Sequence, residues 1–159
     1  MTHKYDSIVE NLRKVFDEMA ALGLLDVLAK GGVGEIILAN HLGHDLVAND
    51  KGADGLGADN KKYEYKVSVT DQFNFHFGTR ISQSGETPSD KVKRHFNGLS
   101  GSFCALRHGT KIKKLIFVPT DELVSNLCDH FNSTTGQQLN KNYNFAKLKT
   151  LPNVNIIID

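Results

Sequence analysis

An acidic and a basic residue lie two positions apart within a stretch of alternating aromatic and branched residues. The stretch YEYKVSV covers residues 63–69 and contains Glu64 and Lys66. Side chains alternate between the two faces of a β-strand, so this spacing places Glu64 and Lys66 on one face and the apolar residues on the other. A carboxylate and an amine on one face can bind a metal ion and direct a water molecule, which is the chemistry of hydrolysis.

A second carboxylate, Asp54, lies ten residues before Glu64 on a short predicted strand. Pairing of the two strands would bring these carboxylates together, and close carboxylates repel each other and raise a pKa. A divalent cation removes this repulsion, and Mg²⁺ is typically held by one or two carboxylates, water and a substrate phosphate. We therefore predict a Mg²⁺ site made by Asp54, Glu64 and the backbone carbonyl of Tyr65. Lys66 faces the same site, where its charge can position the attacking water and stabilise the pentacovalent phosphate.

Glu35 is a third acidic candidate, because it lies in the otherwise apolar stretch GGVGEIILANHLG of a predicted helix. A carboxylate among apolar residues is unfavourable unless it has a partner, so we expect Glu35 to point toward the metal and complete or support its ligands. Asp50 is an alternative to Asp54 as the metal ligand. The glycines around Asp54 allow a close approach of the backbone and favour Asp54.

The spacing acid-x-Lys also arises by chance, and the chain contains a second example, Asp59-Asn60-Lys61. This second triplet lies in a turn-forming stretch and lacks the alternating neighbours of a strand. The first triplet has strand alternation, an upstream acid and a preceding helix that carries an acid. The alternative interpretation of Glu64 and Lys66 is a surface ion pair on an exposed strand face.

Hydrophobic periodicity and turn residues predict the elements that position these side chains. Predicted helices cover residues 5–28, 33–43 and 88–108 and a stretch that begins at Thr120, and predicted strands cover 44–50, 53–56, 63–77, 111–120 and 153–159. Residues 78–90 and 132–144 are predicted loops. A capping box in TPSD, residues 87–90, starts the third helix.

The order of these elements predicts one α/β domain over residues 1–159, with a mixed central sheet and helices on both faces. Early strands that are close in sequence should pair antiparallel. The strand at 112–118 returns after a helix and could join the sheet in parallel.

Composition favours a cytoplasmic protein. No apolar run reaches the roughly 20 residues of a membrane helix, and the charged N-terminus is not a signal peptide. Cys104 and Cys128 are expected to be reduced thiols. The net charge is +1, but residues 61–120 hold eleven Lys and Arg against four Asp and Glu. This basic middle could meet a polyanion or could be a solvated surface.

A polar and basic segment, residues 78–95, follows the predicted catalytic strand. Arg and Gln suit contacts with guanine and adenine edges, and Lys suits phosphates. We therefore predict DNA contacts for Arg80, Gln83, Lys91, Lys93 and Arg94. The alternative is a solvated loop and helix face.

The order of a helix with Gly-Glu, then Ala-Asp-Gly, then YEYKVS resembles the PD-(D/E)XK nuclease superfamily, and more narrowly its type II restriction endonucleases. The resemblance is good over residues 30–70 and covers the rest only in outline. By this resemblance Asp54 is the first acid, Glu64 and Lys66 form the second half of the motif, and Glu35 is the helix acid. Ala53 stands where the motif has proline.

The resemblance implies a restriction-endonuclease-like fold and Mg²⁺-dependent hydrolysis of DNA that leaves 5′-phosphate ends. We therefore expect a site-specific endonuclease on double-stranded DNA. A homodimer on a palindromic site, or sequential nicks by a monomer, would cut both strands. The alternatives are a non-catalytic DNA-binding or assembly protein on the same scaffold, and a structure-specific repair nuclease or junction resolvase.

Overall fold

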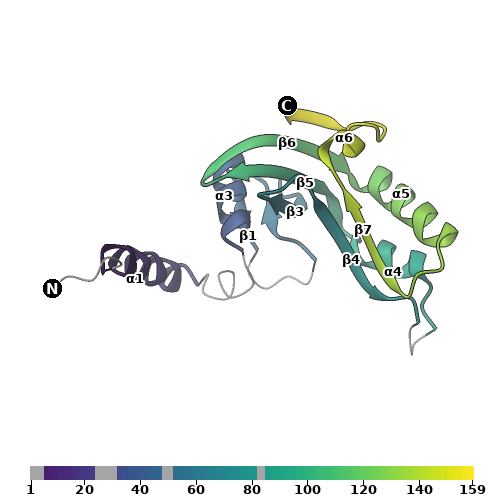
Figure 1. The fold of residues 1–159 in the computed structure, drawn as a ribbon, viewed down its shortest axis with the longest axis horizontal. Coiled ribbons are helices and arrows are strands. Elements are labelled where there is room, and N and C mark those ends of the chain that lie inside the picture. Colours follow the sequence, from purple (N-terminus) through teal and green to yellow (C-terminus); the bar gives the residue numbers. More distant parts are fainter. Residues whose placement is uncertain (1–5, 24–31, 48–51, 82–84) are drawn as a thin grey trace. The chain divides into compact units, whose positions relative to one another are not determined.

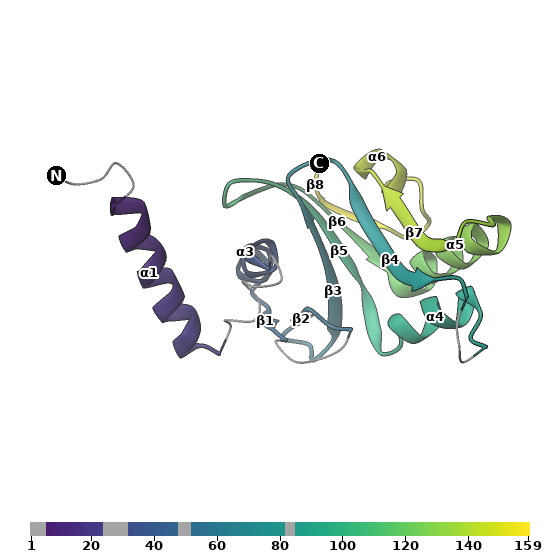
Figure 2. The ribbon, with the colours of Figure 1, turned by 60° about the horizontal axis from the view of Figure 1, so that its bottom comes forward.

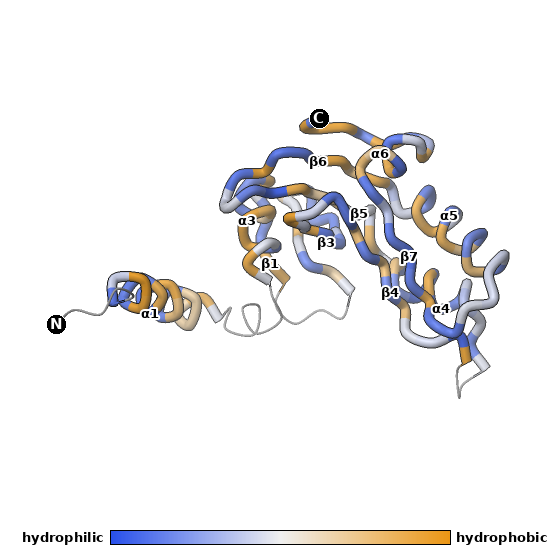
Figure 3. The backbone as a smooth tube through the Cα atoms, viewed as in Figure 1, coloured by the Kyte–Doolittle hydropathy of each residue, from blue (hydrophilic) through white to orange (hydrophobic). Residues whose placement is uncertain are grey.

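The computed structural model describes residues 6–23, 32–47, 52–81 and 85–159. The chain divides into two compact units, Met1–Val33 and Gly34–Asp159. The first unit contains α1 (Asp6–Ala21), which confirms this part of the predicted helix. Apolar and polar residues alternate along α1 in Figure 3, and its apolar residues Ile8, Leu12 and Val15 are exposed.

Six strands of the second unit form a mixed central sheet in the order β1-β2-β3-β5-β6-β8 (Figure 1). Their bounds are β1 (Asp45–Leu46), β2 (Gly55–Leu56), β3 (Lys62–Ser68), β5 (Leu99–His108), β6 (Lys111–Pro119) and β8 (Asn155–Ile158). Strands β3 and β5 are parallel, and the other neighbours are antiparallel. The structure therefore confirms an α/β protein with a mixed central sheet. We expected that the strand at 112–118 could pair in parallel with its neighbours. This expectation is wrong, because β6 is antiparallel to β5 and to β8.

A second sheet consists of β4 (Phe73–Thr79) and β7 (Gln138–Tyr143), paired antiparallel. The predicted single strand over 63–77 is therefore wrong. A tight turn, in which the Gln72 N–H donates to the Thr70 carbonyl at 2.7 Å, moves the chain from the central sheet into the second one. The predicted loop over 132–144 is also wrong, since β7 buries Leu139 and Tyr143 on alternate positions.

Three of the next four described helices, α3, α4 and α5, begin where the sequence predicts. Their bounds are α3 (Val33–Leu42), α4 (Pro88–His95), α5 (Thr120–Ser133) and α6 (Phe145–Leu148), of which only α6 was not expected. The capping box of α4 is confirmed: the Asp90 N–H donates to the Thr87 hydroxyl, and the Thr87 N–H donates to the Asp90 carboxylate. At α5, Pro119 is the N-cap, while the Thr120 hydroxyl donates to the Leu99 carbonyl at 2.7 Å.

The predicted third helix ends early. Helix α4 stops at His95, Gly98 adopts a positive φ of 80°, and Leu99, Phe103 and Leu106 belong to β5. Strand β5 lies between β3 and β6 and buries residues from Gly101 to Ala105 on both faces. Apolar residues on both faces remove the period of two that identifies a strand, so the spacing of its large residues matched a helix by coincidence.

Two hydrophobic cores lie on opposite faces of the central sheet. One packs Leu38 and Ala39 of α3 against Tyr63, Tyr65 and neighbouring residues of β5 and β6. The other packs the second sheet, α4, α5 and α6 on the opposite face. Figure 2 shows α3 on one side of β3 and β4 with α4 on the other. This arrangement gives Glu64 and Lys66 a covered face that is separate from the aromatic face.

Two further sequence expectations concern the thiols and the membrane. Cys104 and Cys128 are both free, as expected for reduced thiols. Within the described ranges, the structure contains no helix with the length and apolar content needed to cross a membrane.

Candidate active site

Strand β3 carries Glu64 and Lys66 on one face, as the alternation predicts. Tyr63 and Tyr65 are buried in the core under α3, while the Lys66 ammonium lies 5.3 Å from the centre of the Phe75 ring in the second sheet. Glu64 is only 4 % exposed, and Lys66 donates a hydrogen bond to its Oε1. Glu64 is buried and Lys66 is half-buried, so the two residues form a largely covered ion pair and not the exposed surface pair that was the alternative.

The pairing of β2 with β3 brings Asp54 to the same place. The Asp54 N–H donates to the Tyr63 carbonyl at 2.9 Å, and the Tyr65 N–H donates to Asp54 Oδ2 at 2.7 Å. The next residue, Gly55, pairs with Tyr63, and a Cβ built on Gly55 would lie 2.0 Å from the Tyr65 hydroxyl. Glycine at position 55 is therefore required for the close approach that positions Asp54.

His95 is a member of the site that the sequence did not identify. It ends α4, and its Nε2 lies 3.3 Å from Glu64 Oε2, so both carboxylate oxygens of Glu64 have partners. Its ring packs edge-on against Phe77 and Phe96. The sequence showed His95 only as part of the basic segment, because 31 residues separate it from Glu64 and no local spacing links the two.

The charges of the site act strongly on one another. Burial and the nearby Glu64 carboxylate raise the pKa of Asp54. Burial also favours a higher pKa for Glu64, but the His95 hydrogen bond and the Lys66 charge outweigh it and lower that pKa. For Lys66, the carboxylates of Glu64 and Asp54 overcome burial and raise the pKa. These shifts favour an ionised Glu64 and a protonated Lys66, whereas burial and the Glu64 carboxylate disfavour a negative charge on Asp54.

The donor set fits a magnesium ion. Mg²⁺ needs only one or two carboxylates beside water and phosphate, and a cation next to Asp54 and Glu64 would relieve the repulsion that raises the pKa of Asp54. Ser102 pairs with Glu64 across β3 and β5, and its buried hydroxyl has no hydrogen-bond partner among the described residues. Among the residues that the structure describes, no three His, Cys, Asp or Glu side chains lie close enough together to bind a metal ion. Asp54 and Glu64 are the two carboxylates that could hold such an ion, with water and substrate completing its coordination.

Of the other predicted acids, Glu35 lies away from this cluster. Glu35 lies half-buried in the first turn of α3, and α3 covers the aromatic face of β3, opposite to Glu64 and Lys66. Asp50, the alternative to Asp54, lies outside the described residues. The second triplet forms an exposed ion pair, in which Lys61 lies 3.0 Å from Asp59.

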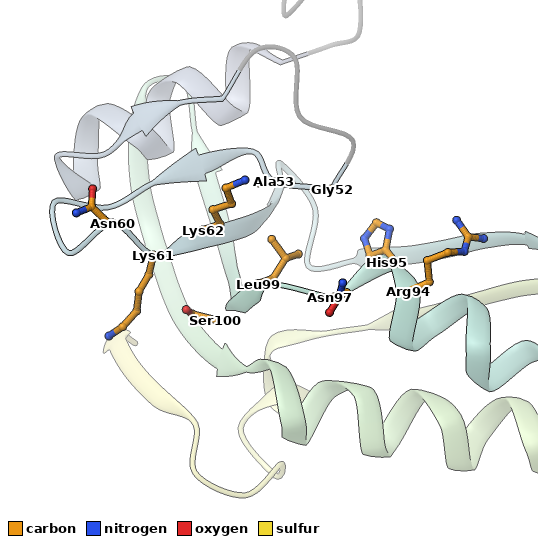
Figure 4. A pocket seen from close by; sticks show the side chains of 11 residues that line it. Gly52, Ala53, Asn60, Lys61, Lys62, Arg94, His95, Asn97, Leu99 and Ser100 are labelled. Carbon is orange, nitrogen blue, oxygen red and sulfur yellow. The ribbon is translucent and has the colours of Figure 1, made fainter.

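A cavity of about 500 Å³ is lined by residues that neighbour or contact the acidic cluster, and Figure 4 shows its lining side chains. Ala53, the neighbour of Asp54, and His95, the partner of Glu64, both line it. Its other charged lining residues are Lys61, Lys62 and Arg94. The cavity is therefore basic, and it adjoins the acidic cluster through Ala53 and His95 without being lined by Asp54, Glu64 or Lys66.

Four of the predicted DNA-binding residues lie directly after β4 or on α4. Arg80 donates to the Gly136 carbonyl and the Thr134 hydroxyl, Lys91 donates to the Thr79 carbonyl, and Arg94 forms two hydrogen bonds with Glu86. Lys93 lies on the exposed side of α4, and Gln83 lies outside the described residues. Three of the basic side chains are thus held by hydrogen bonds within the protein, and Arg94 also lines the cavity.

Comparison with known protein families finds none that matches this chain, and comparison with curated proteins finds no match.

Proposed function

We propose that this chain is a Mg²⁺-dependent endonuclease that hydrolyses phosphodiester bonds of double-stranded DNA. We assign it to the PD-(D/E)XK superfamily, with a restriction-endonuclease-like fold, and infer that it is a type II restriction enzyme or its catalytic domain. The observation that carries this proposal is the convergence of Asp54, Glu64 and Lys66 through the pairing of β2 with β3. The basic cavity beside these residues supports a phosphate-containing substrate.

Each residue has a role that follows from its position. Asp54 and Glu64, with the backbone carbonyl of Tyr65, would hold Mg²⁺, which when bound stabilises negative charge on the phosphoryl oxygens. Lys66 is protonated and orients the attacking water and stabilises the charge that develops on the phosphate. His95 holds Glu64 in one orientation, which makes it a positioning residue.

The duplex is bound outside this cluster. Lys61 and Lys62 line the cavity and are suited to the phosphates that flank the cleaved bond. A chain with a single site of this kind cuts one strand at a time, so we propose that two copies act on a palindromic sequence or that one copy nicks each strand in turn.

The test is cleavage of a supercoiled plasmid by the wild-type chain and by Lys66→Ala, each with Mg²⁺ or with EDTA. We expect the wild type to nick or linearise the plasmid only with Mg²⁺, and we expect Lys66→Ala to lose roughly 10²-fold or more in rate while it still binds DNA. Lys111→Ala, an exposed lysine at the start of β6, is the matched control and should cleave normally.

The folding of each variant is measured separately from its cleavage, so a loss of cleavage can be distinguished from a loss of folding. Full cleavage by a folded Lys66→Ala variant would remove the catalytic assignment. DNA binding without Mg²⁺-dependent cleavage by the wild type would identify a non-catalytic DNA-binding protein, and cleavage confined to branched or damaged DNA would identify a repair nuclease or junction resolvase.

A further inference from the structure

Ser102 of β5 is a buried polar residue to which the proposed mechanism gives no role. Its side chain is 0 % exposed, and its Oγ has no hydrogen-bond partner among the residues that the structure describes. Buried hydroxyl groups are nearly always hydrogen-bonded, because an unpaired one loses its hydrogen bonds to water without compensation. An unpaired hydroxyl inside the central sheet therefore points to a partner that comes within reach when the protein acts.

The pairing of β3 with β5, which lie side by side in Figure 2, places Ser102 on the face of the sheet that carries the acidic cluster. Ser102 is paired with Glu64, and Cys104 is paired with Lys66. Phe103 lies in the core under α3, whereas Cys104 lies in the core on the opposite face. Because side chains alternate along a strand, Ser102 points to the same face as Cys104, which is also the face of Glu64 and Lys66.

Glu64 can accept a further hydrogen bond. Its Oε1 accepts a hydrogen bond from Lys66, and its Oε2 lies 3.3 Å from His95 Nε2. A carboxylate offers about four acceptor positions, so these two partners leave others free. Ser102 lies in register on the next strand, and its hydroxyl is a neutral group that can donate to one of them.

The charge of each partner decides whether it can stay beside Glu64 when a cation binds. Lys66 is positively charged, so it competes with a cation for the same carboxylate. A hydroxyl group is neutral and can donate to an oxygen of Glu64 without repelling a cation beside it. Carboxylates that bind metal ions are themselves hydrogen-bonded, and loss of such a partner lowers metal affinity roughly 10- to 100-fold.

We propose that Ser102 is a positioning residue of the magnesium site, which donates a hydrogen bond to Glu64 in the cation-bound state. Glu64 then keeps its orientation through a neutral donor, and Lys66 is free to orient the attacking water. This inference rests on the proposed function, because it takes Asp54 and Glu64 as the ligands of Mg²⁺. It extends the site from β3 to its parallel neighbour β5.

The test compares the wild type with Ser102→Ala in the absence of DNA. The Mg²⁺ affinity of each is obtained from the rise of the thermal unfolding midpoint with Mg²⁺ concentration. We expect Ser102→Ala to need about tenfold more Mg²⁺ for the same rise. In EDTA its unfolding midpoint should be no lower than that of the wild type, because the substitution removes an unpaired buried hydroxyl.

The plasmid assay gives a second measurement on the same variant. The Mg²⁺ concentration that gives half-maximal nicking should rise about tenfold in Ser102→Ala, whereas the nicking rate at saturating Mg²⁺ should stay close to that of the wild type. A residue that only supports the fold would not separate these two quantities.

Two further variants distinguish positioning from packing. Ser102→Thr keeps the hydroxyl group but adds a methyl group at a fully buried position. Its unfolding midpoint in EDTA should therefore fall, while its Mg²⁺ affinity should stay within about twofold of that of the wild type. Cys104→Ala is the matched control, because Cys104 is equally buried on the same strand and is paired with Lys66. It should leave the Mg²⁺ affinity unchanged.

Failure of this inference can be told apart from failure of the proposed function. If Mg²⁺ stabilises Ser102→Ala as strongly as the wild type, the inference is overturned and the proposed function is unaffected. A loss of stability of Ser102→Ala in EDTA with wild-type Mg²⁺ affinity would likewise overturn it, since the hydroxyl would then have only a structural role. If Mg²⁺ neither stabilises the wild type nor supports nicking, the proposed function fails and the inference fails with it.

Discussion

Asp54 carries the least favourable charge of the candidate site, since burial and Glu64 both raise its pKa. The substitution Asp54→Asn keeps an oxygen that can accept the Tyr65 N–H and removes the repulsion. We expect it to abolish Mg²⁺-dependent cleavage and to raise the free energy of unfolding by about 1 kcal/mol at pH 7.5, or roughly 2–4 °C. Thermal unfolding with and without Mg²⁺ checks this, because Mg²⁺ should stabilise the wild type more than the variant.

The sign of the pH dependence follows from the direction of the pKa shift. A carboxyl group whose pKa is raised in the folded state favours folding while it is protonated, and this stabilisation is lost as pH rises through the folded-state pKa. The stability gap between Asp54→Asn and the wild type should therefore be small near pH 4 and reach its full size at neutral pH. Asp129→Asn, an exposed carboxylate of α5, serves as the control. Equal stabilities of Asp54→Asn and the wild type at pH 7.5 would contradict the argument.

The types and spacing of the residues predicted the part of the site that lies on β3 and next to β2. Alternation placed Glu64 and Lys66 on one face, and the glycines near Asp54 indicated a close approach of β2 that the structure contains. His95 could not be found this way. Its contact with Glu64 depends on the packing of α4 over the sheet, which leaves no local pattern in the sequence.

At the scale of elements, the glycine-rich strand β2 has a testable steric role. A Cβ at position 55 would collide with the Tyr65 ring, and Tyr65 is held by a 2.7 Å hydrogen bond between its hydroxyl and His44 Nδ1. We expect Gly55→Ala to destabilise the fold by about 2 kcal/mol and to displace Asp54, so that cleavage falls as well. Chemical denaturation and the plasmid assay measure the two effects.

Gly136 provides the control for this substitution, because the nearest atom to a Cβ there is 4.0 Å away. Gly136→Ala should change stability by less than about 0.5 kcal/mol. A Gly55→Ala variant as stable as the wild type would show that β2 can move away from β3 without loss.

Elements with clear end signals were predicted well, and those defined by long-range pairing were not. The capping box fixed the start of α4, whereas β5 looked helical because both of its faces are buried. Strand β7 was assigned to a loop because its asparagines outweighed the alternation of Leu139 and Tyr143. In both cases the segment forms a strand because it pairs with a strand that is distant in sequence.

At the scale of the whole molecule, the division of the chain into two units predicts what truncation does. The sheet, both cores and the candidate site all belong to Gly34–Asp159. Removal of residues 1–31 leaves α3 intact, so we expect the shortened chain to unfold cooperatively, within about 3 °C of the full chain, and to retain Mg²⁺-dependent nicking. Circular dichroism and the plasmid assay check this, and loss of cooperative unfolding would contradict it.

The parallel pairing of β3 with β5 has a consequence for synthesis of the protein. Residues 62–68 of β3 meet residues 99–106 of β5, and His95 is made between them. A growing chain on the ribosome therefore displays its acidic pair and lysine well before the strand and the imidazole that fix them have emerged. The proposed cutting activity should arise only after translation has passed about residue 108, so an incomplete product of such a nuclease would pose little danger to the DNA of the cell that makes it.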